Sequence, residues 1–121
     1  IVLGQADETF HHVYDVVLGA QLTAISIVRP GMKSQECDSL SQSVIQEAGH
    51  GNDFGHGLGY SVGLAAHEAP QVDLNDNDRL TVGTVFTIGP SIYIPGWGGV
   101  RIKDIVLLEQ AGATPLSKAR K

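Results

Sequence analysis

The sequence predicts an α+β domain in which two helices cover one face of a mostly antiparallel sheet. Three observations indicate this class. Apolar residues recur at spacings of three and four through the first 50 positions, as on amphipathic helices. The pattern then changes to short β-branched segments, and glycine- and proline-rich turns separate them. At 121 residues the chain accommodates one core, so we expect a single domain over residues 1–121.

The first predicted helix begins after Asp7, a suitable N-cap, and runs to about Val28. Pro30 and Gly31 end it, because proline lacks an amide hydrogen and cannot continue a helix. One buried stripe is expected from Phe10, Val13, Val17, Ala20, Ala24, Ile25 and Val28.

The second predicted helix starts at a Ser34 cap, runs to about Ala48 and stops at Gly49. Its inward residues are expected to be Cys37, Leu40, Val44 and Ile45. Because Cys37 lies on this apolar stripe, we interpret it as a small buried hydrophobe and not as a reactive thiol.

The remaining chain is predicted to be β-structure. Residues 51–66 contain strand segments broken by glycines, and residues 73–78 form a polar turn. Residues 82–94 and 100–108 form a hairpin around a turn rich in glycine. We expect the basic tail after residue 113 to fray. The site is expected on the sheet face that the helices leave open.

Composition excludes several function classes. A net charge of −5 and a pI near 5.3 argue against nucleic acid, which requires a basic face, and against an anionic membrane surface. No apolar run reaches the roughly 18 residues of a membrane span. The single cysteine excludes an internal disulfide and suits a reducing compartment, so the expected location is cytoplasmic.

Three phrases are candidates for a site: FGHGLGYSVGLAAHEAP at 54–70, TIGPSIYIPGWGG at 87–99 and VRIKD at 100–104. Together they resemble the C-terminal half of the catalytic domain of Xaa-Pro dipeptidases and aminopeptidase P. These enzymes belong to peptidase family M24, the pita-bread fold family that includes methionine aminopeptidases and creatinase. The resemblance implies half of a pita-bread fold.

The resemblance also implies two divalent metal ions, such as Mn or Co, held by two Asp, one His and two Glu. The ions would activate a water that attacks the peptide bond before proline. The family's two aspartates belong upstream of Ile1. Its histidine corresponds to Tyr60, seven residues before His67, and its glutamates correspond to Gly89 and Lys103. None of the five expected ligands is present in this sequence.

Estimated free energies argue against metal binding at Tyr60, Gly89 and Lys103. Deprotonating a tyrosine with a pKa near 10 at neutral pH costs about 4 kcal/mol. Glycine offers only its backbone, and a lysine ammonium about 4 Å from a divalent ion repels it by roughly 8 kcal/mol at an effective dielectric of ~20. We therefore predict no metal cofactor and a non-catalytic structural or peptide-binding module.

Three family positions are retained. By resemblance His56 and His67 are substrate-side histidines, and Arg101 lies beside the second glutamate position. Either these three residues line a pocket that holds a peptide or carboxylate, or they are inherited from an ancestor whose enzymatic activity this chain has lost. We favour the second interpretation.

Other hypotheses stay open at this point. The second hypothesis is a fragment of a metal-dependent Xaa-Pro dipeptidase, because the apolar start of the chain resembles the end of a strand cut from something longer. A metal-free creatinase-like hydrolase would use His56 or His67 as general base. A zinc site from His50, His56 and His67 matches no common ligand spacing. A lone half would also expose a sheet edge, which predicts a homodimer that replaces the missing half.

Overall fold

The computed structural model describes residues 6–54, 57–62, 68–72 and 78–121, and in them two helices precede seven strands. The helices are α1 (Glu8–Ile27) and α2 (Ser34–Glu47). The strands are β1 (Gly59–Ser61), β2 (Glu68–Val72), β3 (Val85–Ile88), β4 (Ser91–Ile94), β5 (Gly98–Arg101), β6 (Asp104–Glu109) and β7 (Gly112–Pro115).

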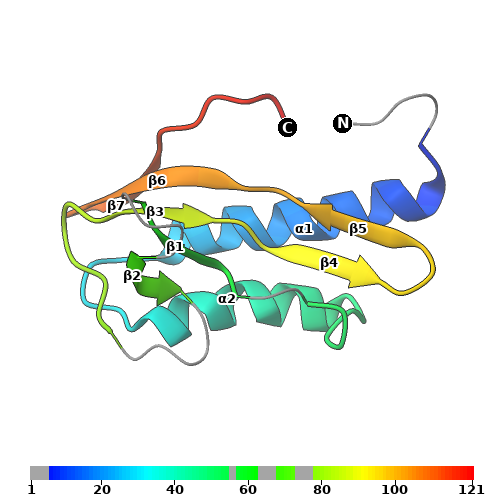
Figure 1. Ribbon diagram of the computed structural model, residues 1–121, viewed down its shortest axis with the longest axis horizontal. Coiled ribbons are helices and arrows are strands. Elements are labelled where there is room, and N and C mark those ends of the chain that lie inside the picture. Colours follow the sequence, from blue (N-terminus) through cyan, green and yellow to red (C-terminus); the bar gives the residue numbers. More distant parts are fainter. Residues whose placement is uncertain (1–5, 55–56, 63–67, 73–77) are drawn as a thin grey trace.

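The described strands form an antiparallel sheet in the order β2-β1-β3-β6-β7 and a separate β4-β5 ribbon. Both helices pack on one side of these strands (Figure 1). One apolar cluster joins the helices to the five-stranded sheet, around Phe86 and Ile88. A second joins them to the ribbon, around Val17 and Ile92. The predicted α+β class is confirmed.

The predicted start of α1 is confirmed, and the predicted cap of α2 is wrong. The Asp7 carboxylate accepts a hydrogen bond from the Phe10 amide at 2.7 Å. Ser34, in contrast, is the first residue of α2, and the preceding Lys33 makes no side-chain cap. The Ser34 hydroxyl instead donates to the Asp78 carbonyl at 3.1 Å, because its side chain is buried against the segment that leads to β3.

The buried faces of the helices contain polar residues that the apolar pattern did not predict. Gln21 on α1 and Ser41 on α2 are both fully buried. The Ser41 hydroxyl donates to the Ala20 carbonyl at 3.1 Å and so ties the two helices together. Leu40 and Val44, predicted to point inward, are only half-buried.

Cys37 is fully buried, as expected from its place on the apolar stripe. Burial, with a smaller contribution from the Asp38 charge, raises the pKa of the Cys37 thiol to about 12. The thiol is therefore protonated at neutral pH, which agrees with a packing role.

The predicted hairpin is present, but it is interrupted. Ile94 pairs with Gly98 across the turn, and the ribbon runs to the pair of Ser91 with Arg101. The ladder resumes with Ile88 opposite Asp104. Residues 89–90 and 102–103 lie between these two pairings and belong to no named strand.

The beginning of the C-terminal tail pairs with β6, which the sequence analysis did not predict. Residues 112–115 form β7 on the edge of the sheet. The chain then continues beside β6 in the same direction, where the Leu116 amide donates to the Ile105 carbonyl at 2.7 Å and the Ile105 amide donates to the Ser117 hydroxyl at 2.8 Å. Backbone pairing with β6 therefore holds a segment that its polar composition marked as loose.

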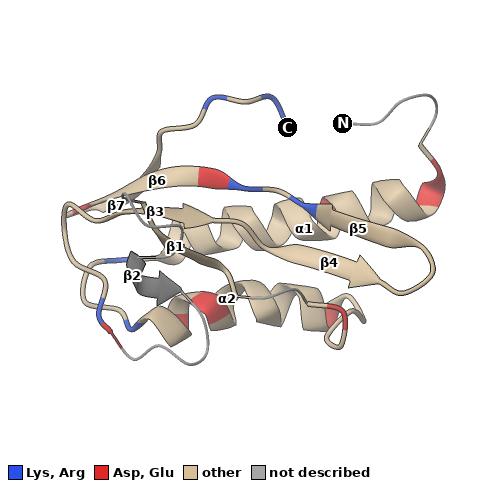
Figure 2. Cartoon of the chain, viewed as in Figure 1, with Lys and Arg blue, Asp and Glu red and all other residues tan. Residues whose placement is uncertain are grey.

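Charge is unevenly placed on the described chain. Figure 2 shows basic residues along the C-terminal tail and at the junction of β5 with β6, while acidic residues lie on both helices. None of the described helices is long and apolar enough to cross a membrane.

Candidate functional site

Tyr60 is held at the centre of β1 by its contacts with β3. The Tyr60 amide donates to the Thr87 hydroxyl at 3.1 Å, and that hydroxyl lies 3.5 Å from the Tyr60 carbonyl oxygen. The strands approach closely beside Gly59, where an added Cβ would lie 1.7 Å from the Thr87 carbonyl oxygen. A glycine is therefore required there to bring Tyr60 against β3.

Gly89 and Lys103 face each other where the ladder is interrupted. A Cβ added at Gly89 would lie 3.0 Å from both the Cβ and the Cγ of Lys103, and 3.2 Å from the Arg101 Nε. The aliphatic stem of Lys103 thus lies against the backbone of Gly89. The Gly89 amide is fixed from the other side, since it donates to the Leu58 carbonyl at 2.7 Å.

Lys103 reaches from this position to Tyr60. Its Nζ donates a hydrogen bond to the Tyr60 hydroxyl and lies 4.5 Å from the centroid of the Tyr60 ring. The hydrogen bond from Lys103, together with its charge and a smaller effect of Arg101, lowers the pKa of the Tyr60 phenol from its ordinary value of 10.0. The ammonium is therefore engaged with a phenol oxygen and an aromatic face.

Arg101 completes the group. Its side chain is exposed, and its Nε donates to the Gly89 carbonyl at 3.1 Å. We call Tyr60, Gly89, Arg101 and Lys103 the cation–phenol cluster. The structure thus brings together four of the six residues that the sequence singled out, from β1, from the ends of β3 and β5, and from the segment before β6.

His56 and His67 lie outside the described residues, so their predicted roles are not tested. The zinc hypothesis depends on the same two residues. Its third member, His50, has its Nδ1 3.2 Å from the Asp53 carboxylate and its ring beside that of His12. Within the described ranges, no three His, Cys, Asp or Glu side chains gather as a metal site would require.

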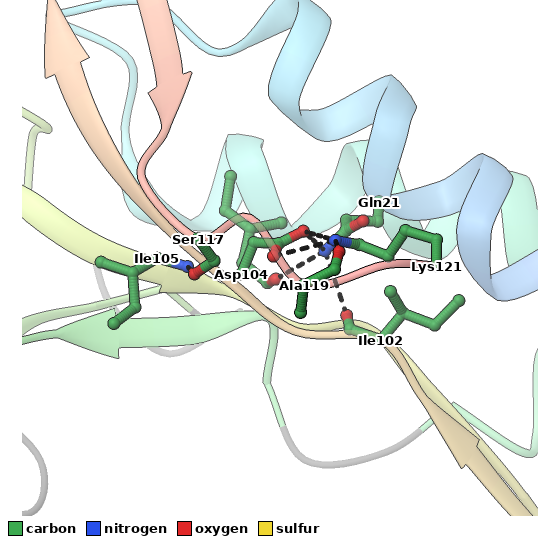
Figure 3. Close-up of polar contacts among 8 residues, drawn as sticks. Gln21, Ile102, Asp104, Ile105, Ser117, Ala119 and Lys121 are labelled. Carbon is green, nitrogen blue, oxygen red and sulfur yellow. Dashed lines mark hydrogen bonds and ion pairs between the residues drawn. The ribbon is translucent and has the colours of Figure 1, made fainter. Parts of the chain in front are cut away.

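Two residues behind the cluster were missed by the sequence analysis. Gln21 is fully buried on α1, and Asp104, which directly follows Lys103, is 4% exposed. Figure 3 shows both side chains converging with Lys121 from the tail. The Lys121 Nζ lies 2.7 Å from Asp104 Oδ2. A glutamine between Val17 and Ala24 on the apolar stripe was the available signal, because a polar residue at an inward position needs buried partners.

Fold and site positions together identify the class of protein. The chain belongs to metallopeptidase family M24, whose family model matches residues 1–110.

Individual relatives agree with this assignment. The chain is 44% identical, over all 121 residues, to an Xaa-Pro dipeptidase of Pyrococcus furiosus, of which it spans 35%. It matches the structure of the prolidase from that organism with a TM-score of 0.96, covering all of this chain and 36% of the other. An Xaa-Pro dipeptidase structure from Bacillus anthracis matches with a TM-score of 0.96 at 36% identity, covering 100% of this chain and 34% of that one.

These comparisons confirm the pita-bread resemblance and the fold class. They also show that the chain spans about a third of the length of the relatives it matches. The activity of those longer proteins is therefore not assigned to this chain by similarity alone.

The lowered pKa of Tyr60 gives a direct test of the cluster. We expect the phenol of Tyr60 to titrate below 10.0, and Lys103→Met to raise the midpoint toward that value by removing the donor and its charge. Because the folded-state pKa is the lower one, the linked stabilisation is present at alkaline pH and is lost as pH falls through the folded pKa. The measurement is the phenolate absorbance of the chain minus that of Tyr60→Phe. A midpoint unchanged by Lys103→Met would contradict the contact.

Proposed function

We propose that this chain is a non-catalytic M24 half-domain that acts as a structural or peptide-binding module. The observation that supports this most directly is the contact of Lys103 with Tyr60 beside Gly89. These are the three positions where the family resemblance predicts a histidine and two glutamates. Here a phenol, a bare backbone and an ammonium interact with one another, and none supplies a carboxylate or imidazole.

Electrostatics supports the same conclusion. A bridging carboxylate offsets the charge of two divalent ions, whereas the ammonium of Lys103 adds to it. The guanidinium of Arg101 lies within hydrogen-bond distance of Gly89 and brings a second positive charge to the cluster. A cation that enters this region therefore meets two like charges, while an anionic group meets complementary ones.

Metal binding tests the proposal. We expect isothermal titration with Mn²⁺ or Co²⁺ to detect no stoichiometric binding to this chain. The triple variant Tyr60→His, Gly89→Glu, Lys103→Glu should gain measurable binding, because it replaces the ammonium and supplies an imidazole and two carboxylates. The matched control is Gly89→Glu alone, whose new carboxylate would pair with Lys103 and Arg101 and leave the metal unbound. Stoichiometric Mn²⁺ or Co²⁺ on the unmodified chain would overturn the proposal.

The peptide-binding role is tested with an Xaa-Pro dipeptide, the substrate class in the names of the relatives. We expect the dipeptide to bind through its carboxylate without being cleaved, and Arg101→Gln to weaken binding about tenfold, equivalent to about 1.4 kcal/mol. Arg79→Gln is the control, since Arg79 also donates to a glycine carbonyl, that of Gly31, but lies outside the cluster. Equal binding by both variants would leave only the structural role. Cleavage in the presence of Mn²⁺ would instead favour a peptidase fragment.

The predicted homodimer is also part of this proposal. Ile105 on β6 is 37% exposed and Leu116, which hydrogen-bonds to it in the tail, is 48% exposed. A second copy that covers these two apolar side chains would bury both of them. Light scattering should give the mass of a dimer, and Ile105→Lys should shift it toward that of a monomer. A stable monomer at tens of micromolar, before any substitution, is the outcome that would remove the dimer.

A further inference from the structure

Gln21 is a buried polar residue placed directly behind the cation–phenol cluster. It lies on the face of α1 that packs against the strands and is fully inaccessible to solvent. An amide at such a position is costly unless its hydrogen bonds are satisfied, so its partners show what it does in the fold.

The partners of Gln21 all lie in the two chain segments that carry Gly89 and Lys103. Its Nε2 lies 3.0 Å from Asp104 Oδ2, 3.3 Å from the Ile88 carbonyl oxygen and 3.3 Å from the Ile102 carbonyl oxygen. Two amide hydrogens are thus shared among three acceptors. Figure 3 shows the side chain reaching from α1 to Asp104 and Ile102.

These acceptors flank two members of the cluster. Ile88 directly precedes Gly89, and Ile102 and Asp104 stand on either side of Lys103. This is the point where the ladder between the two chain segments is interrupted, between the pair of Ile88 with Asp104 and the ribbon beyond. Gln21 therefore supplies hydrogen bonds to both segments where strand pairing is reduced.

Asp104 is fixed from two directions. The Lys121 Nζ lies 2.7 Å from its Oδ2 and 3.0 Å from its Oδ1, and Gln21 donates to the same Oδ2 from the core. Removing the amide would leave a carboxylate that is 4% exposed with one donor fewer and would leave two backbone carbonyls without this donor. The segment that carries Lys103 would then be free to shift.

We infer that Gln21 is a positioning residue for the cation–phenol cluster. By holding the carbonyls of Ile88 and Ile102 at a common donor, it sets the separation of Gly89 from Lys103 and so the reach of the Lys103 ammonium to Tyr60. The inference depends on the proposed function only for the role of the cluster, and its geometry can be measured independently of metal or peptide.

The test uses the Lys103 side chain as a reporter. Because its ammonium lies over the Tyr60 ring, the adjacent methylene protons should be shifted upfield in the NMR spectrum, relative to their positions in Tyr60→Leu. Gln21→Met has a similar shape but no hydrogen-bond donors, and it should lose about half or more of this upfield chemical shift. Ser41→Ala is the matched control. It removes a buried hydrogen bond from α2 to the Ala20 carbonyl of α1 but none of the three hydrogen bonds of Gln21, so it should lower the melting temperature while the upfield shift of the Lys103 protons persists.

Two results would overturn the inference. One is an undiminished upfield shift of the Lys103 protons in folded Gln21→Met, and the other is an equal loss of that shift in Ser41→Ala. If Gln21→Met does not fold, Gln21→Asn provides the second variant, since it keeps an amide in the core but withdraws it from all three acceptors. Retention of the upfield shift in Gln21→Asn would likewise overturn the inference. Mn²⁺ titration of the unmodified chain reports separately on the proposed function, so the two can fail independently.

Discussion

The hydrogen bond between Lys103 and Tyr60 is the interaction on which the character of this site depends. It joins the segment before β6 to β1 across β3, and it commits the ammonium to a phenol oxygen and an aromatic face. The contact requires that no side chain project from Gly89, because the stem of Lys103 lies against that backbone. It also requires the close approach of β1 to Thr87 that Gly59 permits. The identity of each position is thus coupled to the others.

On the proposed function, this coupling predicts that a single substitution would not create a metal site. A carboxylate at position 89 alone would meet Lys103 and Arg101, two cations already in place, and would form ion pairs with them. A carboxylate at position 103 alone would leave Tyr60 without its donor and would still face a glycine. A histidine at position 60 alone would face the Lys103 ammonium. Only simultaneous substitution at positions 60, 89 and 103 would replace these interacting side chains with a set of metal ligands.

The sequence predicted the fold class, both helices, the hairpin and the positions that form the cluster, because each depends on local pattern or on a motif. Asp7 as an N-cap and the apolar stripe of α1 are examples. It did not predict the interruption of the ladder, the role of Gln21 or the pairing of the tail with β6. Those features arise from contacts between residues 67 to 83 positions apart, or from backbone pairing that composition does not encode. Lys121 appeared to belong to a solvated tail, yet it contacts a buried carboxylate.

The separation of fold from chemistry follows from the alternation of side chains along a strand. On β6, Asp104, Val106 and Leu108 are buried on the side that packs against the helices, whereas Ile105 between them is exposed, as is Lys103 just before the strand. The core depends on the first set, and Lys103, at a position where the family resemblance implies a metal ligand, belongs to the exposed set. Substitutions at Tyr60, Gly89 and Lys103 therefore leave the packing of Phe86 and Ile88 on the helices in place. This is how the chain can match prolidase structures with a TM-score of 0.96 while it lacks the ligands that the family resemblance predicts for these positions.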